Sequence, residues 1–237
     1  MNSDRRIERL QVKAASLSSE RMGFYRLIKA LLSLPFRLAF RPLVEGEEHI
    51  PSEGAVLLVA NHRSFFDSFF QALALRRPLH WMAKSELFKY PGLAWLLVRL
   101  GAFPVRRGAS DAQAINTALE LLSAGEAVAV FPEGTRVREG LGKPRRGAER
   151  LAEEAQVPTV AMAIVGTERG VLRRSLWHQG ERVRISIAPP IAASEPERQM
   201  WPEVEARVGL LEGRRKEAVA LGALSIGVLA ALISRRR

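Results

Sequence analysis

The chain has 237 residues, 47% of them hydrophobic, and it contains no cysteine. This length and apolar content predict one α/β domain with added helices and a sizeable core, while the missing thiols exclude disulfides and cysteine nucleophiles. The 36 Lys and Arg residues outnumber the 25 Asp and Glu residues, which gives a formal net charge of +11. Such an excess favours a polyanionic partner, either a membrane surface or a nucleic acid.

The amino-terminal region, residues 1–43, is predicted to be a basic segment that associates with a membrane. Residues before Met22 are polar, lack the apolar core of a secretory signal, and are expected to be loosely ordered. From Phe24 to Arg41, basic residues are interspersed with aliphatic and aromatic ones. This pattern predicts two short amphipathic helices, broken near Pro35, that lie among lipid headgroups. The alternative is a helical pair packed on the domain with its arginines in water.

Apolar runs separated by helical patterns predict the central domain, residues 44–212. A helix is expected at 110–124, with Ser110 as its cap and Gly125 at its end. The alternation of strands and helices predicts an α/β fold with a mixed, largely parallel sheet covered by helices. The predicted core strands are residues 55–60, 79–83, 102–105, 126–131, 159–165 and 183–188.

The first of these strands leads into the sequence from Asn61 to Asp67, where a histidine and an aspartate stand five positions apart. A loop that turns from strand into helix can bring the Asp67 carboxylate to one imidazole nitrogen of His62. The other nitrogen then remains free to take a proton from a substrate hydroxyl near neutral pH. The pattern therefore indicates a catalytic base and the residue that orients it.

The same residues have a purely structural interpretation. Ser64 and Asp67 have the spacing of a capping box, which satisfies free backbone amides at the start of a helix. Phe66, Phe69, Phe70 and Leu73 then fall on one helical face and are expected in the core. Capping does not explain why Asn61 and His62 end a buried strand, so both interpretations stay open at this point.

Two further segments carry polar groups at predicted strand ends. The run from Gly101 to Gly108 ends in Arg106 and Arg107, which is either a binding element or a solvated basic loop. The run from Phe131 to Arg136 follows an apolar strand and supplies a carboxylate, a hydroxyl and a guanidinium. Ligands of open α/β folds bind at the carboxyl ends of strands, and a guanidinium can bind phosphate through two hydrogen bonds.

In this order, the three segments resemble the glycerolipid acyltransferase family, which includes the 1-acylglycerol-3-phosphate (lysophosphatidate) acyltransferases. The resemblance runs from about residue 44 to 191 and includes the segment 83–88. It implies that His62 and Asp67 are catalytic and that Arg107 stands at the phosphate-binding position. It also implies that the unchanged block from Phe131 to Arg136 takes part in substrate binding.

The chain departs from the family pattern at two places. The fourth block usually has two prolines, whereas residues 157–161 have only Pro158. Because that block is thought to shape the acyl pocket, the acyl preference is not predicted. Arg106 stands where many relatives carry an acidic residue, and the added charge favours an anionic acceptor.

The reaction implied is acyl transfer from a thioester to a hydroxyl, with acyl-coenzyme A or acyl-carrier protein as co-substrate and no cofactor. Arg107 and Arg136 are predicted to hold the acceptor phosphate, assisted by Thr135 and the Gly134 backbone. Glu133 is predicted to contact substrate, binding the glycerol hydroxyls, or else to brace Arg136. An acyl-enzyme on Ser64 is the less favoured mechanism. No metal site is predicted, since the four histidines show no paired ligand spacing.

The remaining segment, residues 213–237, contains an apolar run at 218–233 between basic flanks. At about sixteen residues it is shorter than the roughly twenty needed to span a bilayer, although snorkelling bases and local thinning can close the gap. It is predicted to be an apolar helix, either inserted into the membrane or buried on the domain.

The predicted protein is an acyltransferase of the cytoplasmic membrane, with its catalytic domain on the cytosolic face. Its expected partners are membrane lipids, the acyl donor and a lysophospholipid acceptor, most plausibly 1-acylglycerol-3-phosphate, and no nucleic acid. The alternatives are another acceptor, such as glycerol 3-phosphate or a different lyso-lipid, and a non-catalytic basic protein that binds membranes.

Overall fold

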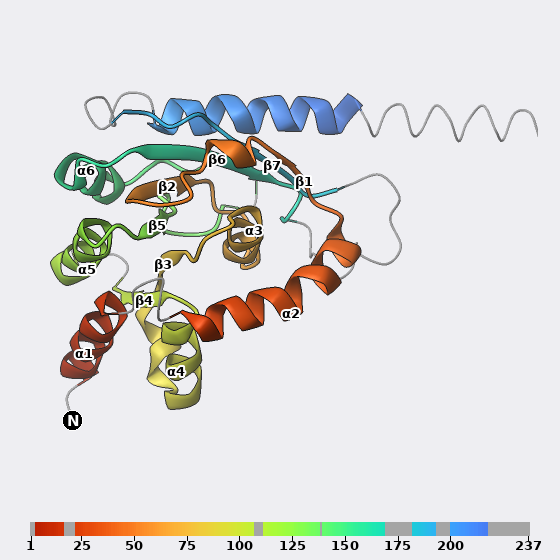
Figure 1. The fold of residues 1–237 in the computed structure, drawn as a ribbon. Coiled ribbons are helices and arrows are strands. Elements are labelled where there is room, and N and C mark those ends of the chain that lie inside the picture. Colours follow the sequence, from red (N-terminus) through yellow and green to blue (C-terminus); the bar gives the residue numbers. More distant parts are fainter. Residues whose placement is uncertain are drawn as a thin grey trace, which may run out of the picture.

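The computed structural model describes residues 3–16, 22–106, 111–137, 139–168, 182–192 and 200–217. Within these ranges one sheet forms the centre of the molecule, and helices cover both of its faces (Figure 1). The strands are β1 (Leu43–Glu45), β2 (Val56–Ala60), β3 (His80–Lys84), β4 (Ala102–Val105), β5 (Ala127–Val130), β6 (Thr159–Val165) and β7 (Arg184–Ile187). The α-helices are α1 (Ser3–Ala15), α2 (Gly23–Phe40), α3 (Asp67–Ala74), α4 (Pro91–Arg99), α5 (Ala112–Ser123) and α6 (Arg146–Ala155), joined by short 3-10 turns at η2 (Glu47–His49) and η3 (Ser85–Lys89). Residues 200–217 form a further helix, called the 200–217 helix below.

The sheet has the strand order β1-β7-β6-β2-β5-β3-β4. From β6 to β4 all neighbouring strands are parallel, whereas β7 is antiparallel to β6 and pairs in parallel with β1. The predicted mixed, largely parallel sheet covered by helices is therefore confirmed. Because Val59 pairs with Val130, β2 and β5 end side by side at the same edge.

Side chains of the central strands point alternately to two apolar layers, as the pleat of a strand requires. In β2, Leu57 and Val59 face the layer that contains α1, α5, α6 and the 200–217 helix. Val56, Leu58 and Ala60 face the opposite layer, against α2 and α3. All five residues of β2 are buried, and burial on both faces explains why parallel strands read as continuous apolar runs.

For residues 3–16, the expectation that the chain before Met22 is loosely ordered was wrong, because α1 packs on the domain. Ala14 lies in the main core, and the buried Gln11 side chain donates from Nε2 to the Pro104 carbonyl across 2.9 Å. Ile7, Leu10 and Ala14 recur at helical spacing, so a weak amphipathic signal was present. The many charges around it masked that signal.

The predicted break near Pro35 was also wrong, because α2 is one helix with Pro35 inside it. A proline removes one helical hydrogen bond and need not end the helix when tertiary packing compensates. That packing comes from Phe36 and Phe40, whose rings lie 5.0 and 5.7 Å from the ring of the buried Phe70. The helix ends at Phe40, and its C-cap, Arg41, adopts a left-handed conformation with φ 41°.

Two smaller expectations concern helix ends and domain limits. The cap of α5 is Asp111, whose side chain accepts from the Ala114 amide, while the predicted cap Ser110 lies outside the described residues. The three-part division of the chain stays a prediction, and the 200–217 helix runs across its limit at residue 213.

Of the helices that the structure describes, none is both long and apolar enough to cross a bilayer. The apolar run 218–233 lies outside the described residues.

Candidate active site

The candidate site lies at the carboxyl ends of β2 and β5, the two neighbouring strands at the centre of the sheet. His62 follows β2, and Phe131 follows β5 directly. Their rings stack with centroids 4.1 Å apart. Both residues line a cleft of about 610 Å³ that extends toward α5 and α6. This is the edge at which open α/β sheets bind ligands.

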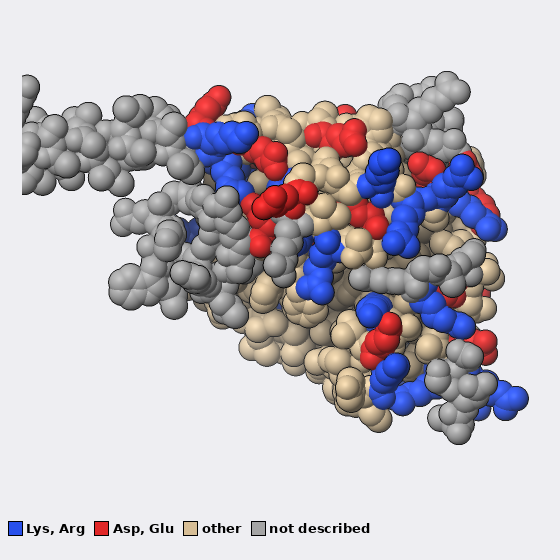
Figure 2. Space-filling view, turned by 180° about the vertical axis from the view of Figure 1, so that it is seen from behind, with Lys and Arg blue, Asp and Glu red and all other residues tan. Residues whose placement is uncertain are grey.

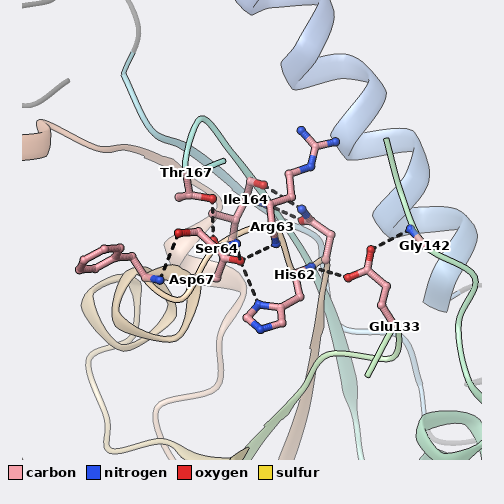
Figure 3. Close-up of polar contacts among 10 residues, drawn as sticks. His62, Arg63, Ser64, Asp67, Glu133, Gly142, Ile164 and Thr167 are labelled. Atoms are coloured by element: carbon pink, nitrogen blue, oxygen red, sulfur yellow. Dashed lines mark hydrogen bonds and ion pairs between the residues drawn. The ribbon is translucent and has the colours of Figure 1, made fainter. Parts of the chain in front are cut away.

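His62 is held by the aspartate that the sequence paired with it. Its Nδ1 lies 3.0 Å from Asp67 Oδ2, and Asp67 is fully buried at the first residue of α3 (Figure 3). A carboxylate on Nδ1 fixes the tautomer that carries a proton there, and Nε2 is left as the basic nitrogen. Because His62 lines the cleft, the structure supports the interpretation as a base and its orienter.

Asp67 also binds the loop that precedes it, which agrees with the structural interpretation in part: the N-cap of α3 is Phe66, not Ser64, and it makes no side-chain capping bond. Its Oδ2 accepts from the backbone amides of Arg63 at 2.6 Å and Ser64 at 2.7 Å. Its Oδ1 accepts from Thr167 Oγ1 at 2.6 Å (Figure 3). One carboxylate therefore shapes the turn between β2 and α3 and orients the imidazole. Four donors around a fully buried group also hold it in one rotamer.

Asn61 and Arg63, on either side of His62, anchor the loop to the rest of the domain. The Asn61 amide donates to the Ile164 carbonyl at 2.9 Å and accepts from the Ile164 amide at 2.8 Å, so its side chain continues the pairing of β2 with β6. The buried Arg63 guanidinium donates to the Gly140 carbonyl and lies 2.7 Å from Glu212 of the 200–217 helix. These contacts explain why an amide and a guanidinium flank the histidine.

Glu133 braces the same loop from the opposite side. Its Oε2 accepts from the His62 backbone amide at 2.5 Å, and its Oε1 accepts from the Gly142 amide at 2.9 Å (Figure 3). The residue is buried, and burial raises the pKa of its carboxyl group although both amide contacts act in the other direction. Glu133 thus joins β5 to His62 and to the chain that leads toward α6.

The far part of the cleft is basic. Arg106, Arg145, Arg146 and Arg150 line it beside the start of α6, together with three acidic residues and an apolar wall. Lys and Arg side chains gather on this side of the molecule, with acidic side chains among them (Figure 2). The cleft therefore combines a base, guanidinium groups and an apolar wall, which suits an anionic substrate with an apolar part.

The family model described as Acyltransferase matches residues 41–165, more than half of the chain. The chain belongs to the acyltransferase family. The resemblance on which the sequence prediction rested is therefore confirmed, and the matched region covers His62, Asp67 and the block from Phe131 to Arg136.

Named relatives agree with this placement in the acyltransferase family. The chain is 30% identical over 182 residues to the chloroplastic 1-acyl-sn-glycerol-3-phosphate acyltransferase BAT2 of Brassica napus. This alignment covers 74% of this chain and 52% of the plant protein. It is 30% identical over 149 residues to the 1-acyl-sn-glycerol-3-phosphate acyltransferase of Bacillus subtilis. This alignment covers 62% of this chain and 72% of the Bacillus protein. The chain thus spans about half the length of the plant relative.

A solved structure shows the same fold. The crystal structure of PlsC, the 1-acyl-sn-glycerophosphate (LPA) acyltransferase from Thermotoga maritima, matches with a TM-score of 0.60 and 23% sequence identity. The match covers 89% of this chain and 98% of that one. At this identity the comparison shows the acyltransferase fold alone.

The residues of the block from Phe131 to Arg136 differ in whether they line the cleft. Gly134 lines the cleft, and its φ of 65° is left-handed; a Cβ here would lie 2.8 Å from Arg145 Nε, so glycine lets that guanidinium pass. Thr135 and Arg136 are exposed and are not among the residues that line the cleft. Their contact with substrate stays a prediction, as does that of Glu133, whose oxygens both accept from backbone amides.

Other predicted residues are either unplaced or have new partners. Arg107, the predicted phosphate ligand, lies outside the described residues, and so does His178. Sequence reasoning missed Thr167, Arg145 and Arg146. Two adjacent arginines were a usable signal for the last two, whereas Thr167 lies 100 positions from Asp67 and gave none.

The other described histidines are placed away from the cleft. His49 Nδ1 lies 2.9 Å from the Ile187 carbonyl. His80 begins β3 and is fully buried, with Nε2 3.8 Å from Glu126 Oε2, and burial lowers its pKa to about 4. No group of three or more His, Asp or Glu side chains within the described ranges is arranged to hold a metal ion.

Proposed function

We propose that this protein is a membrane-associated O-acyltransferase that transfers a fatty acyl group from a thioester donor to the free hydroxyl of 1-acylglycerol-3-phosphate, forming phosphatidate. The observation that carries the proposal is the buried pair of His62 Nδ1 and Asp67 Oδ2, 3.0 Å apart, with His62 lining a cleft that guanidinium groups also line. The pair provides a base, and the cleft provides charge for a phosphate.

The reaction follows from this geometry in two proton transfers. His62 Nε2 takes the proton from the acceptor hydroxyl as its oxygen attacks the thioester carbonyl, and Asp67 stabilises the imidazolium that forms. The tetrahedral intermediate then breaks its carbon–sulfur bond. The leaving thiolate receives the proton from His62, so the base is restored for the next cycle. No step needs Ser64, whose Oγ accepts from the Phe66 amide.

The acceptor assignment rests on the relatives and on the charge of the cleft. The plant and bacterial relatives are named for 1-acyl-sn-glycerol-3-phosphate, a lipid with a phosphomonoester. Arg106, Arg145 and Arg146 line the cleft beyond His62 and suit such a group. The apolar lining, which includes Met82 and Ile115, suits a fatty acyl chain. The donor is either acyl-coenzyme A or acyl-carrier protein.

The exposed face of α2 supports the proposed membrane association. Leu27, Leu31, Leu34 and Leu38 recur at helical spacing and are 56–69% exposed. On the other side of the helix, Phe36 contacts Phe66 and Phe69, and both contact the exposed Phe65 in the loop between His62 and Asp67. An apolar surface that adjoins the active-site loop suits an enzyme whose acceptor resides in a bilayer.

The proposed location is the cytosolic face of the cytoplasmic membrane. A soluble thioester donor must reach the cleft from the aqueous side, while a lysophospholipid arrives from the lipid side. A net charge of +11 favours attraction to the anionic lipids of that face.

The direct test supplies the purified protein, in vesicles, with 1-acylglycerol-3-phosphate and either acyl-coenzyme A or acyl-carrier protein, and measures phosphatidate. His62→Ala is expected to lower turnover by about a hundredfold to ten-thousandfold, the usual contribution of a positioned base. His49→Ala removes an imidazole outside the cleft and serves as the matched control. Near wild-type turnover by folded His62→Ala, or no product with either donor, would refute the proposal.

A further inference from the structure

Three helices, α1, the start of α2 and α4, come together on one side of the molecule (Figure 1). Their side chains line a second cavity, separate from the cleft around His62. It is a groove of about 320 Å³ whose lining shares no residue with the cleft around His62. It is called the α1–α4 groove below.

The walls of the α1–α4 groove are apolar and aromatic. Leu10 and Val98 contribute aliphatic surface, and the rings of Phe24 and Trp95 meet edge to face with centroids 5.5 Å apart. Trp95 is half exposed, whereas the neighbouring Val98 is buried, so the groove leads from an open rim to an apolar floor. Such a wall suits the hydrocarbon part of a ligand.

Three cations border these walls: Arg6, Lys13 and Arg99. None of the described residues that line the groove is acidic, and no described Asp or Glu pairs with any of the three. Arg99 lies over Trp95, with its guanidinium carbon 4.5 Å from the ring centroid, and Arg6 donates to the Lys89 carbonyl. The contacts of Arg6 and Arg99 hold these two side chains at the rim without compensating their charge, which favours an anionic group.

The groove also adjoins the surface that the proposed function places against the membrane. Phe24 starts the helical stripe that continues through Leu27 and Leu31, both exposed. A ligand can therefore extend from the groove onto the same apolar face of α2. Charge at the rim, an apolar wall and continuity with an exposed apolar stripe together select a ligand with a phosphate at one end and hydrocarbon at the other.

We propose that the α1–α4 groove binds an anionic glycerophospholipid, with its phosphate on Arg6, Lys13 and Arg99 and an acyl chain against Phe24 and Trp95. The bound lipid fixes α1 and α2 to the bilayer surface at a defined place. It acts as a partner of the protein and is neither substrate nor product at this site.

Fluorescence of Trp95 tests the proposal without reference to activity. The full chain is bound to vesicles of phosphatidylcholine with one fifth phosphatidylglycerol, and bromine quenchers are placed on the acyl chains of one lipid or the other. The contribution of Trp95 is the difference between the wild type and Trp95→Phe. Selective binding predicts quenching by brominated phosphatidylglycerol well above its share of the lipid, whereas quenching in proportion to that share overturns the proposal.

Two matched variants separate a built site from general attraction. Lys13→Gln with Arg99→Gln removes two exposed charges from the rim. We expect this pair to remove the excess quenching, meaning the quenching by brominated phosphatidylglycerol above its share of the lipid, and to weaken binding of phosphatidylglycerol at least about tenfold. Arg5→Gln with Arg26→Gln removes two exposed charges from α1 and α2 outside the groove and should leave the excess quenching unchanged. Equal effects of the two pairs would overturn the proposal, as would loss of the excess on adding millimolar inorganic phosphate.

These results are independent of the proposed reaction. Measured in detergent micelles, phosphatidate formation by the rim variant should equal that of the wild type. Selective quenching by an inactive enzyme would refute the proposed reaction and leave the lipid site in place.

Discussion

Thr167 Oγ1 donates a hydrogen bond to Asp67 Oδ1 across 2.6 Å, and both residues are buried. Thr167 follows β6, whereas Asp67 opens α3, so the bond ties the carboxylate that orients His62 to a different strand end. Thr167 touches no reacting atom in this arrangement. It is a positioning residue, because it holds Asp67 with Oδ2 directed at the imidazole.

The first prediction concerns this bond. Thr167→Val keeps the volume of the side chain and removes the donor, and we expect the turnover number to fall by about tenfold to a hundredfold, since a hydrogen bond to a charged group contributes about 1.5–3 kcal/mol. Thr167→Ser keeps the hydroxyl and should retain most activity. Turnover and thermal unfolding of both variants check this; equal losses for valine and serine would point to packing instead.

The second prediction tests the charge of Asp67. Asp67→Asn leaves an acceptor for the amides of Arg63 and Ser64 but no longer stabilises an imidazolium. We expect turnover to fall by about 10² to 10⁴ while the Michaelis constants for both substrates change little. Steady-state kinetics with each substrate varied in turn make the comparison. A variant with near wild-type turnover would show that Asp67 serves only the turn.

The third prediction concerns Glu133. Both oxygens accept from backbone amides, so Glu133→Gln turns one acceptor into a donor facing a donor. We expect the free energy of unfolding to fall by about 1–3 kcal/mol, the cost of an unsatisfied buried polar group. Urea unfolding measures this effect, and the exposed Glu205→Gln is the control. An unchanged free energy would favour a role of Glu133 with substrate alone.

The fourth prediction compares two arginines. Both side chains are exposed, but only Arg146 lines the cleft. Arg146→Gln should raise the Michaelis constant for the phosphate-bearing acceptor by about tenfold or more, and Arg136→Gln should raise it less. Initial rates over a range of acceptor concentrations distinguish them. A larger effect at Arg136 would restore the assignment made from sequence.

The fifth prediction concerns pH. Burial lowers the pKa of His80 to about 4, compared with 6.5 for an exposed imidazole. Between these values the unfolded chain binds a proton that the folded protein does not, so the free energy of unfolding falls as the pH drops from 6.5 to 4, by up to about 3 kcal/mol. Urea unfolding at pH 7 and pH 4 should show a smaller drop for His80→Gln. If the free energy of unfolding fell equally for both proteins, the charge of a protonated His80 would be compensated within the fold, by Glu126 at 3.8 Å.

The sequence by itself determined six of the seven described strands, all but β1, and the pairing of His62 with Asp67. Buried parallel strands are continuous apolar runs, so strands such as β4 and β6 could be located to the residue. The distance between His62 and Asp67 depends on one short turn from strand into helix, and local geometry decides it. The same local pattern could not show that Asp67 both caps the turn and orients the imidazole.

Only the tertiary structure decided what surrounds that pair. Thr167 reaches Asp67, and Glu133 reaches the amide of His62, because β2, β5 and β6 end at one edge of the sheet. The continuity of α2 through Pro35 likewise depends on Phe36 packing against Phe70. Contacts between residues far apart in the chain leave no periodic signal, and their energies outweigh local preferences, so they had to be seen in the folded protein.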